Sequence, residues 1–450
     1  MDGYFRAVKY LESFVNYEKL DWYSYKKSLG LQRIKSFLQF IGNPQEELKV
    51  IHIAGSKGKG STCVFVAYIL RQAGFSVGLY TSPHLSDFRE RIRILKPRQS
   101  NSQLPFEGSI SKEYLTGLVE FLKPVIKGFE KFSIHNRHFH YGRLSFFEVY
   151  TALAFLYFKE KKVDFVVMET GMGGRLDATN VAQSLVCAIT PISYEHTRYL
   201  GKTLTQIAGE KAGIIKQKSL VISSIQKKEA AQVIQNKSAS LQAKLFTVGK
   251  DIKYSTKGKY FSIKGINNNY TNLRINLLGR HQLINASQAV GIIEALGSYG
   301  FKVSVNCIKK GLYNTLWPGR LEVLCRKPCI VVDGAQNAAS AAVLKSAVTS
   351  IFKYKKLILV FGVSQDKDIK GMVSQLSGLA HKIILTCADN PRAALPKYLK
   401  RYFSAKEKEI FITAGVREAK VLALKVANLQ DLILVTGSLF VVGEFRDAYR

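Results

Sequence analysis

The chain has 450 residues, and 47% of them are hydrophobic, which is enough for packed cores and argues against disorder. Its 66 Lys and Arg residues outnumber 33 Asp and Glu residues, so the net charge is +33 and polyanions, nucleotides and acidic substrates are all attracted to it. Because the basic residues are spread along the whole chain instead of forming a tail or stripe, we interpret them as a lysine-rich surface.

No apolar run approaches the roughly 18–20 residues of a membrane helix, and the first residues lack the layout of a signal peptide. We therefore expect a cytoplasmic protein without a membrane partner. The six cysteines show no zinc-binding spacing, and we expect them to be reduced and mostly buried.

The first 49 residues are predicted to be helical, up to a break at Gly42-Asn43-Pro44. Val50–Ala54 then reads as a short apolar strand, followed by a glycine-rich turn, a helix from Ser61 to about Ala73 and a strand at Ser76–Tyr80. A strand, tight loop, helix and second strand form a βαβ unit, which implies a parallel sheet.

Residues 96–143 are polar and irregular, with a helical piece at 111–127, and we expect an insertion or flexible loop over a site. Arginines lie among the histidines at its basic end, so we interpret these as surface-loop residues and not as zinc ligands: His135, His138 and His140.

An apolar helix is predicted at Phe146–Lys159, with buried strands at Val163–Glu169 and Leu185–Thr190. Short alternating runs with turn signals between 244 and 278 predict antiparallel hairpins, and helix Gln282–Gly297 follows.

A second β/α series follows, with helical stretches between its strands, and it describes a doubly wound domain. The strands are expected at Cys329–Asp333, Leu357–Gly362, Lys382–Thr386, Glu409–Thr413 and Leu432–Thr436. The fold class is therefore α/β. We expect residues 1–314 to form a domain with a parallel sheet plus a small antiparallel sheet, and 315–450 to form a Rossmann-like domain.

The turn after the first strand has the residues of a phosphate loop, Gly55 to Thr62. Gly55, Gly58 and Gly60 let backbone N–H groups face a phosphate, and the N-terminus of the helix adds partial positive charge. Lys59 would reach the β- and γ-phosphates of ATP, and the Ser61 hydroxyl would bind Mg²⁺.

A series of motifs spans nearly the whole chain in a fixed order. The motifs are HIAGSKGKGST (52–62), TSPHLSDFRERIR (81–93), SFFEV (145–149), ETGMGGRLDATN (169–180), ITPISYEHTRYLG with EKAGIIK (189–216), LGRHQLINA (278–286), WPGRLEV (317–323), VDGAQN (332–337), FGVSQDKDI (361–369) and VTGSLFVVGEFR (435–446). With these motifs the chain resembles the folylpolyglutamate synthase and dihydrofolate synthase family of the Mur ligase superfamily.

The resemblance implies ATP-dependent addition of L-glutamate to the carboxylate of dihydropteroate or of a folate, through an acyl phosphate. It implies that residues 1–314 are a Mur-ligase-type central domain and that 315–450 are the glutamate ligase domain. It also implies two Mg²⁺ ions. One would bind at Ser61, and the other at Glu169, His196 and a carbamylated Lys211, because an uncarbamylated lysine is a cation and cannot bind a metal ion.

The remaining site residues also follow from the resemblance. Catalytic roles fall to Lys59, Lys211 and Asp333. The nucleotide would contact His281, Asn285, Arg320 and Asp333 besides the phosphate loop. The acyl acceptor and glutamate would contact Ser82, Arg89, Gly173, Gly174 and Ser438, with Gly171–Arg175 as a mobile loop.

Three positions depart from the family pattern. Ser56-Lys57 replaces Thr-Asn, Glu195 replaces an aspartate before the metal-binding histidine, and Gln336 replaces a histidine. Glutamine forms hydrogen bonds but cannot become cationic, so Gln336 is left out of the catalytic set.

Three other functions are weighed against the folate ligase. A Mur-type ligase acting on a UDP-sugar peptide is disfavoured by the 81–93 and 169–180 motifs. A nucleic-acid-binding P-loop NTPase would need basic residues interleaved with aromatics along one face, and this pattern is not found. A nucleotide-binding protein without ligase activity draws support only from Gln336. We expect a monomer that binds small molecules and no nucleic acid.

Overall fold

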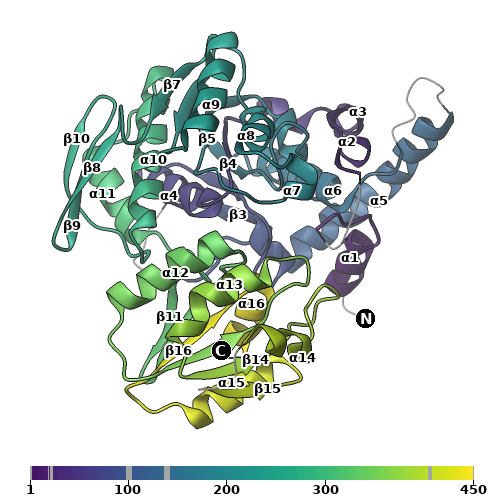
Figure 1. Cartoon of the computed structure of the whole chain (residues 1–450). Coiled ribbons are helices and arrows are strands. Elements are labelled where there is room, and N and C mark those ends of the chain that lie inside the picture. Colours follow the sequence, from purple (N-terminus) through teal and green to yellow (C-terminus); the bar gives the residue numbers. More distant parts are fainter. Residues whose placement is uncertain are drawn as a thin grey trace. The chain divides into compact units, whose positions relative to one another are not determined.

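The computed structural model describes residues 3–18, 20, 24–97, 104–135, 142–403 and 408–448. The chain divides into two compact units (Figure 1). The first unit comprises Met1–His84, Phe88–Asn276 and Gln282–Leu316, and the second comprises Leu85–Asp87, Leu277–His281 and Trp317–Arg450.

The first unit is built on a seven-stranded sheet in the order β3-β2-β4-β1-β5-β6-β7, parallel except for β3. Its strands are β1 (Val50–Ala54), β2 (Val77–Tyr80), β3 (Ile92–Leu95), β4 (Phe165–Glu169), β5 (Ser184–Ile189), β6 (Leu220–Ser223) and β7 (Lys244–Thr247). The central strands are buried along their length, which accounts for their continuous apolar sequences. The predicted βαβ unit is confirmed, and β3 is an additional antiparallel edge strand.

Helices cover this sheet on both faces, as expected for parallel strands joined by crossovers. They are α1 (Gly3–Glu12), α2 (Tyr25–Ser28), α3 (Leu31–Phe40), α4 (Lys59–Gln72), α5 (Lys112–His135), α6 (Phe146–Glu160), α7 (Thr197–Leu200), α8 (Leu204–Ala212), α9 (Lys228–Ser240), α10 (His281–Leu296) and α11 (Val305–Asn314). Short 3-10 turns are η1 (Pro44–Glu47), η2 (Phe88–Arg91) and η3 (Ala178–Val181).

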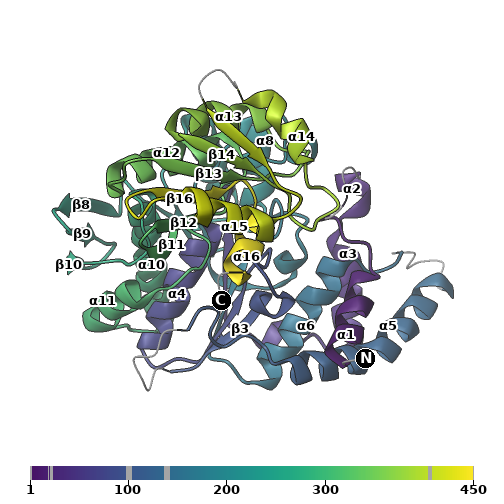
Figure 2. The same cartoon turned by 90° about the horizontal axis from the view of Figure 1, so that it is seen from below.

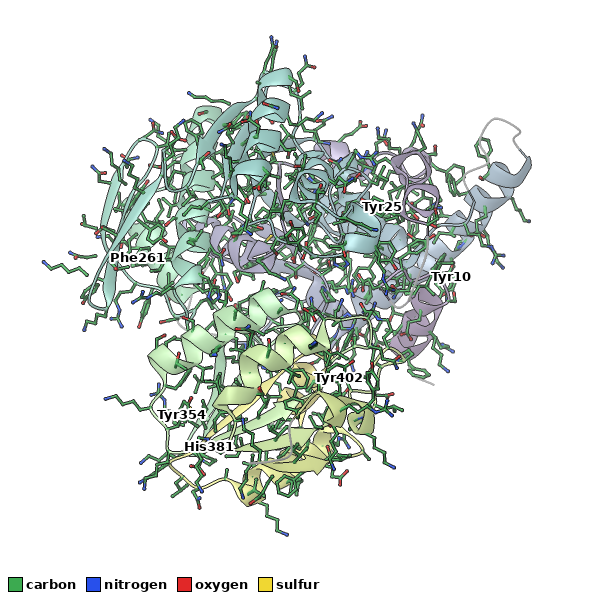
Figure 3. All side chains as sticks on the ribbon, in the orientation of Figure 1. Tyr10, Tyr25, Phe261, Tyr354, His381 and Tyr402 are labelled. Carbon is green, nitrogen blue, oxygen red and sulfur yellow. The ribbon has the colours of Figure 1, made fainter. Side chains whose placement is uncertain are left out.

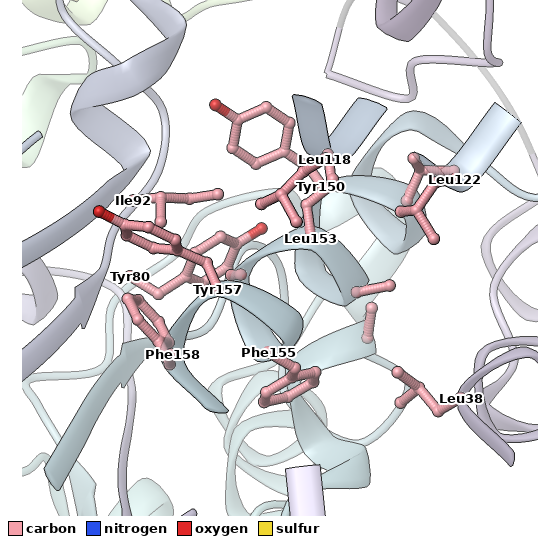
Figure 4. Packing of buried hydrophobic residues seen from close by; sticks show 14 of the residues in the cluster. Leu38, Tyr80, Ile92, Leu118, Leu122, Tyr150, Leu153, Phe155, Tyr157 and Phe158 are labelled. Carbon is pink, nitrogen blue, oxygen red and sulfur yellow. The ribbon is translucent and has the colours of Figure 1, made fainter. Parts of the chain in front are cut away.

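The helical piece predicted at 111–127 is confirmed, but as α5 it continues to His135, and the interpretation of this part as a flexible loop over a site is wrong. Leu115, Leu118, Leu122, Ile126 and Phe129 recur at helical spacing and are buried in one hydrophobic cluster with residues of α6 (Figure 4). This helix is therefore part of the core. Of the histidines, His138 and His140 lie outside the described residues, and His135 ends α5.

The predicted antiparallel hairpins begin later than expected. Residues 244–247 form β7, which pairs in parallel with β6. The small antiparallel sheet consists of β8 (Lys253–Lys257), β9 (Tyr260–Lys264) and β10 (Asn269–Leu273), and Phe261 of β9 is buried (Figure 3). The β9–β10 turn is tied to α10, because the Glu294 carboxylate accepts the N–H of Asn268 at 2.9 Å and the Tyr270 hydroxyl at 3.0 Å.

The second unit has a six-stranded sheet in the order β11-β12-β16-β13-β14-β15. Its elements are β11 (Glu322–Arg326), β12 (Cys329–Asp333), α12 (Ala338–Ile351), β13 (Leu357–Phe361), α13 (Ile369–Leu376), β14 (Lys382–Leu385), α14 (Pro396–Leu399), β15 (Glu409–Ile412), α15 (Val416–Val426), β16 (Leu432–Thr436) and α16 (Leu439–Asp447). The five predicted strands are confirmed as a parallel sheet, and β11 adds an antiparallel edge. Helices α12 and α13 pack together, as do α15 and α16, with the sheet between the two pairs (Figure 2).

No helix within the described ranges is long and apolar enough to cross a membrane. The six cysteines are free, but burial is less common than expected. Cys63 and Cys187 are buried, and the other four are partly exposed.

Candidate functional site

The phosphate loop lies where β1 ends and α4 begins. Gly55 and Gly58 have φ angles of 147° and 83°, which favour glycine. A Cβ on Gly55 would come within 1.8 Å of the Thr190 hydroxyl, and one on Gly58 within 2.3 Å of the Asn285 side-chain oxygen. The loop therefore needs glycine for both backbone angle and space, and Asn285, predicted to contact the nucleotide, lies against it.

The backbone of this loop divides into two parts. The N–H groups of Ser56 and Lys57 donate to the Pro191 carbonyl at 3.0 and 3.1 Å, so they are directed into the protein. The first turn of α4, which holds Gly60 and Ser61, begins directly after them, and N–H groups in a first helical turn have no partner within the helix. The N-terminus of α4 is therefore the anion-binding part of the loop.

Lys59 faces a carboxylate at the end of the neighbouring strand β4. Its Nζ lies 3.9 Å from Glu169 Oε1, and both side chains are largely buried. The other Glu169 oxygen accepts the N–H of Ser82 at 3.2 Å. Three predicted site residues therefore meet at the carboxyl ends of β1, β4 and β2, the edge at which parallel α/β sheets build ligand sites.

Lys211 is 1% exposed and is bound on two sides. Its Nζ donates to the Gly55 carbonyl at 2.8 Å and to Glu195 Oε1 at 2.7 Å. Lys57 approaches the second Glu195 oxygen at 4.0 Å. The structure thus connects Lys211 to the phosphate loop directly and through Glu195, the residue that departs from the family pattern.

Burial and the neighbouring charges together set the pKa values of this cluster. Burial lowers the pKa of Lys211 and the neighbouring Lys59 lowers it further, whereas Glu195 opposes the change. Burial alone would raise the pKa of Glu195, but the surrounding cations outweigh it and bring that pKa to about 2. The cations are Lys211, Lys59, His196 and Lys57.

His196 is exposed and precedes α7 in a left-handed conformation, with φ of 46°. Within the described ranges no three His, Cys, Asp or Glu side chains are grouped closely enough to hold a metal ion. The carboxylate of Glu169 and the hydroxyl of Ser61 are oxygen donors of the kind that Mg²⁺ prefers. The chemistry of Glu169 and Ser61 therefore suits Mg²⁺, whereas Lys211 is bound to Glu195.

The glycine-rich loop after β4 is fastened to the C-terminal half of α8. Arg175 donates its backbone N–H to the Glu210 carbonyl at 2.7 Å and its guanidinium to Glu210 Oε1 at 2.8 Å. Tyr25 (Figure 3) donates to the other Glu210 oxygen at 3.1 Å. A Cβ on Gly173 would lie 2.6 Å from the Tyr25 hydroxyl, and one on Gly174 would lie 2.8 Å from the Glu210 carbonyl. Close approach therefore requires both glycines.

The segment after β2 brings a basic side chain beside aromatic rings. The guanidinium of Arg89 lies 5.6 Å from the centre of the Tyr4 ring. Arg91, in contrast, is buried and forms two hydrogen bonds with Glu18, at 2.8 and 2.6 Å. Arg91 is thus held by a carboxylate in addition to the rings of Phe146 and Tyr150, at 5.4 and 5.8 Å, whereas Arg89 lies over the Tyr4 ring.

In the second unit the carboxylate of Asp333 ends β12. It accepts the N–H groups of Leu321 and Ala335, both at 2.9 Å. Burial raises the pKa of Asp333, and Arg320 opposes the rise. Burial and the same arginine lower the pKa of His281 to about 4, so its ring is neutral at pH 7. These three predicted residues therefore belong to one electrostatic group.

Two further positions are used as helix caps. The Ser438 hydroxyl accepts the N–H of Phe440 at 3.2 Å at the start of α16, and Asn337 forms a capping box with Ser340 at the start of α12. Gln336 is exposed, and its backbone N–H donates to the Ser340 hydroxyl. The Ser438 side chain thus has a structural role besides the predicted contact with substrate.

Sequence reasoning missed Glu210 and Arg91 as parts of the site. Both lie inside the quoted motifs, directly beside Lys211 and two residues after Arg89. The motifs therefore contained the signal. Which side chain of a charged run faces a loop depends on the phase of its helix, which the motif alone does not give.

Family models and known proteins match this architecture. The Mur ligase middle domain model matches residues 131–293, and the model described as Mur ligase, glutamate ligase domain matches residues 319–439. A Bacillus subtilis (strain 168) protein named dihydrofolate synthase/folylpolyglutamate synthase is 34% identical over 425 residues, covering 93% of this chain and 94% of that protein.

Solved structures agree. A folylpolyglutamate synthase from Thermotoga maritima superposes with a TM-score of 0.80 at 33% identity, covering 99% of this chain and 96% of that chain. Escherichia coli FolC in complex with DHPP and ADP superposes with a TM-score of 0.82 at 27% identity, covering 99% of this chain and 97% of that chain. Because these matches extend over more than nine tenths of its length, the chain belongs to the folylpolyglutamate synthase/dihydrofolate synthase family of Mur ligases.

Proposed function

We propose that this protein is an ATP-dependent ligase that joins L-glutamate to the carboxylate of dihydropteroate, of a reduced folate, or of both. The observation that carries the proposal is the group formed by the phosphate loop, Lys59 and Glu169 at the carboxyl edge of the first sheet. The names of the relatives support the substrates, since the Bacillus subtilis protein is called a dihydrofolate synthase/folylpolyglutamate synthase.

The reaction needs activation because a carboxylate and an amine at neutral pH form a salt. The acceptor carboxylate attacks the γ-phosphorus of ATP, the bond to the β-phosphate oxygen breaks, and acyl phosphate and ADP result. The glutamate amine then attacks the acyl carbon, phosphate leaves with the bonding electron pair, and the amine loses a proton to solvent. Lys59 and the N-terminus of α4 stabilise the charge on the transferred phosphoryl group.

Ser61 and Glu169 are the residues proposed to hold Mg²⁺, with His196 as a further ligand. When bound, the ions neutralise the phosphate oxygens. Lys211 is proposed to be carbamylated. Carbamylation requires a neutral amine, and burial of Lys211 lowers its pKa in that direction. The change would replace the ion pair between Lys211 and Glu195 seen here.

We assign residues 1–314 to the ATP-binding domain and 315–450 to the glutamate ligase domain. His281, Asn285, Arg320 and Asp333 are proposed to contact the nucleotide, and Ser438 the glutamate. Ser82, Arg89, Gly173 and Gly174 are proposed for the acyl acceptor. The protein would act as a cytoplasmic monomer on small molecules, without nucleic acid.

The test is glutamate-dependent release of ADP by the purified protein with Mg-ATP, with dihydropteroate and tetrahydrofolate compared as acceptors. Activity with both acceptors would identify a bifunctional enzyme, and activity with one would assign it. No release with either acceptor, from a folded protein that binds ATP, would overturn the proposed substrates. A UDP-sugar peptide should not serve as an acceptor in this assay, and single-stranded nucleic acid should not stimulate ADP release in the absence of glutamate.

A further inference from the structure

A buried chain of hydrogen bonds runs from strand β1 to the glycine-rich loop after β4. His52, in the middle of β1, is fully buried, and its Nε2 lies 2.7 Å from the Thr179 hydroxyl. That hydroxyl lies 2.5 Å from Asp177 Oδ1, and the other Asp177 oxygen accepts the N–H of Met172 at 2.8 Å. Three side chains therefore connect a core strand with the backbone of the loop.

The direction of each hydrogen bond follows from the available protons. Asp177 already accepts the backbone N–H groups of Thr179 and Met172, so its carboxylate acts as an acceptor throughout. Thr179 has one hydroxyl proton and gives it to Asp177. The Nε2 atom of His52 must then carry the proton of the 2.7 Å bond, and the Thr179 oxygen accepts it.

In this tautomer the other ring nitrogen of His52, Nδ1, carries no proton. Its Nδ1 is buried and has no hydrogen-bond partner among the described residues. Burial lowers the pKa of His52 to about 3, so the ring stays neutral at physiological pH. A buried polar atom without a partner is unfavourable, and an apolar residue in β1 would avoid it. The hydrogen bond from Nε2 to Thr179 is therefore the reason for a histidine at this position.

The two ends of this chain are the two loops of the site. Strand β1 continues directly into the phosphate loop, and Met172 lies between Gly171 and Gly173 of the glycine-rich loop. We propose that His52, acting through Thr179 and Asp177, is a positioning residue that holds the glycine-rich loop at a fixed place relative to the phosphate loop. The acceptor carboxylate and the γ-phosphate of ATP are then held at the separation that the reaction needs, a consequence that rests on the function proposed above.

A second attachment holds the far end of the loop. The ion pair of Arg175 with Glu210 is 45% exposed at the arginine and contributes little, but the Arg175 backbone N–H donates to the Glu210 carbonyl at 2.7 Å. The attachment through Asp177 is buried, where hydrogen bonds hold more strongly. Loss of the His52 bond should consequently loosen Met172 and Gly173 more than Arg175.

Hydrogen–deuterium exchange on the full-length protein tests this without any substrate. In a glutamine the Nε2 atom reaches as far as His52 Nε2, whereas an asparagine ends near the position of Nδ1. We expect His52→Asn to speed amide exchange at Met172 and Gly173 by about tenfold, and His52→Gln to stay within about twofold of the natural protein. Thr179→Val should behave like the asparagine variant, and Thr179→Ser like the glutamine variant.

Thr315→Val is the matched control, since it also removes a buried threonine hydroxyl in the first unit, one that donates to the Gly311 carbonyl. It should leave exchange in the glycine-rich loop unchanged. The double variant His52→Asn/Thr179→Val should exchange no faster than either single variant, because both remove the same connection.

Kinetics supply a second readout. His52→Asn should raise the KM for the acyl acceptor about tenfold and leave the KM for ATP within about twofold, since only one loop moves. Equal exchange in the asparagine and glutamine variants, or unchanged exchange in the Asn and Val variants, would overturn the positioning role and leave the proposed function intact. Faster exchange in a protein without ligase activity would keep the positioning role and overturn the function.

Discussion

The carboxyl edges of the two sheets use their polar side chains in opposite ways. At the first edge, Lys59 and Lys211 are paired with carboxylates from other elements, Glu169 and Glu195. At the second edge, the polar side chains mostly serve their own backbone. Asp333 accepts two nearby N–H groups, and Ser438 caps the helix that follows it.

The charged groups of the first edge can bind a ligand, whereas those of the second edge already bind the protein's own backbone. The 3.9 Å separation of Lys59 and Glu169 is longer than a hydrogen bond, so a phosphate or metal ion can take over the role of either partner. The bonds of Asp333 are of ordinary length and hold neighbouring backbone. Substitution of Lys59 should therefore affect catalysis first, whereas substitution of Glu195, Asp333 or Ser438, whose bonds are short, should also lower stability.

The largest expected effect is that of Glu195→Gln in protein whose Lys211 is not carbamylated, because the variant leaves this buried lysine without its anionic partner. Removing one member of a buried ion pair typically costs about 3–5 kcal/mol of the free energy of unfolding. Because the pKa of Glu195 is lowered from 4.5 to about 2, its contribution is complete above pH 4.5 and is lost as the pH falls toward 2. Urea unfolding should show a large gap between variant and natural protein at pH 7 and a smaller gap at pH 3.

Two variants serve as controls for that measurement. Glu195→Leu combined with Lys211→Met removes both charges and should recover much of the lost stability. Lys57→Gln removes only the 4.0 Å contact of a partly exposed lysine and should cost less than about 1 kcal/mol. A gap for Glu195→Gln that does not change with pH would contradict the ionisation argument.

The next largest effect is that of Lys59→Ala on catalysis. Removal of a preorganised charge that faces the transferred group should lower kcat by roughly 10²–10³-fold, with folding retained. ADP release under saturating substrates measures this. Lys57→Ala is the matched control in the same loop and should lower kcat by less than about tenfold, because its charge faces Glu195. Equal losses in the two variants would show that loop charge in general is what matters.

A smaller effect is expected for Asp333→Asn. The amide offers one carbonyl oxygen in place of two carboxylate oxygens, so the N–H of Leu321 or of Ala335 loses its acceptor. An unsatisfied buried donor costs about 1–3 kcal/mol, which hydrogen exchange in β12 and β16 would report. Asp366→Asn, which weakens a partly exposed pair with the adjacent Lys367, should cost less than about 1 kcal/mol. If the two cost the same, the carboxylate of Asp333 is not a backbone anchor.

The smallest effect is that of Ser438→Ala, which removes the N-cap of α16. Such a substitution costs about 1 kcal/mol, whereas Ser438→Gly costs only a few tenths. Thermal unfolding of the second unit distinguishes the two variants. A Ser438→Ala protein as stable as the natural one, but with a raised KM for glutamate, would mean that the serine acts on substrate and not on the helix.

Local patterns were enough to predict most of the fold. The strand at Val50–Ala54 and the five C-terminal strands are apolar runs between turn signals, and all of them are present. The edge strands β3 and β11 were missed. Each is antiparallel, and each overlaps a segment that was interpreted as a family motif and not as a strand. The predicted helix at 111–127 was too short at its C-terminal end because Gly128 has poor helix propensity, although α5 continues to His135 and packs against α1 and α6.

The candidate site was only partly accessible from sequence. The phosphate loop has a local signature, because strand, glycines, lysine and helix are adjacent in the chain. The partnership of Lys211 with Glu195 and the contact of Asn285 with Gly58 join residues from separate elements, and spacing carries no information on them. His52 was overlooked because one histidine in an apolar strand has no motif of its own. Its role depends on Thr179, which only the folded chain brings near.

The position of β1 has a consequence for the order in which the chain can mature. This strand is made early, but both of its neighbours in the sheet, β4 and β5, come from Phe165–Glu169 and Ser184–Ile189. At the usual pace of translation, on the order of ten seconds pass before both have left the ribosome. During that interval the apolar segment VIHIA has no sheet to join, and the nascent chain needs a chaperone or a local cover to keep it from aggregating.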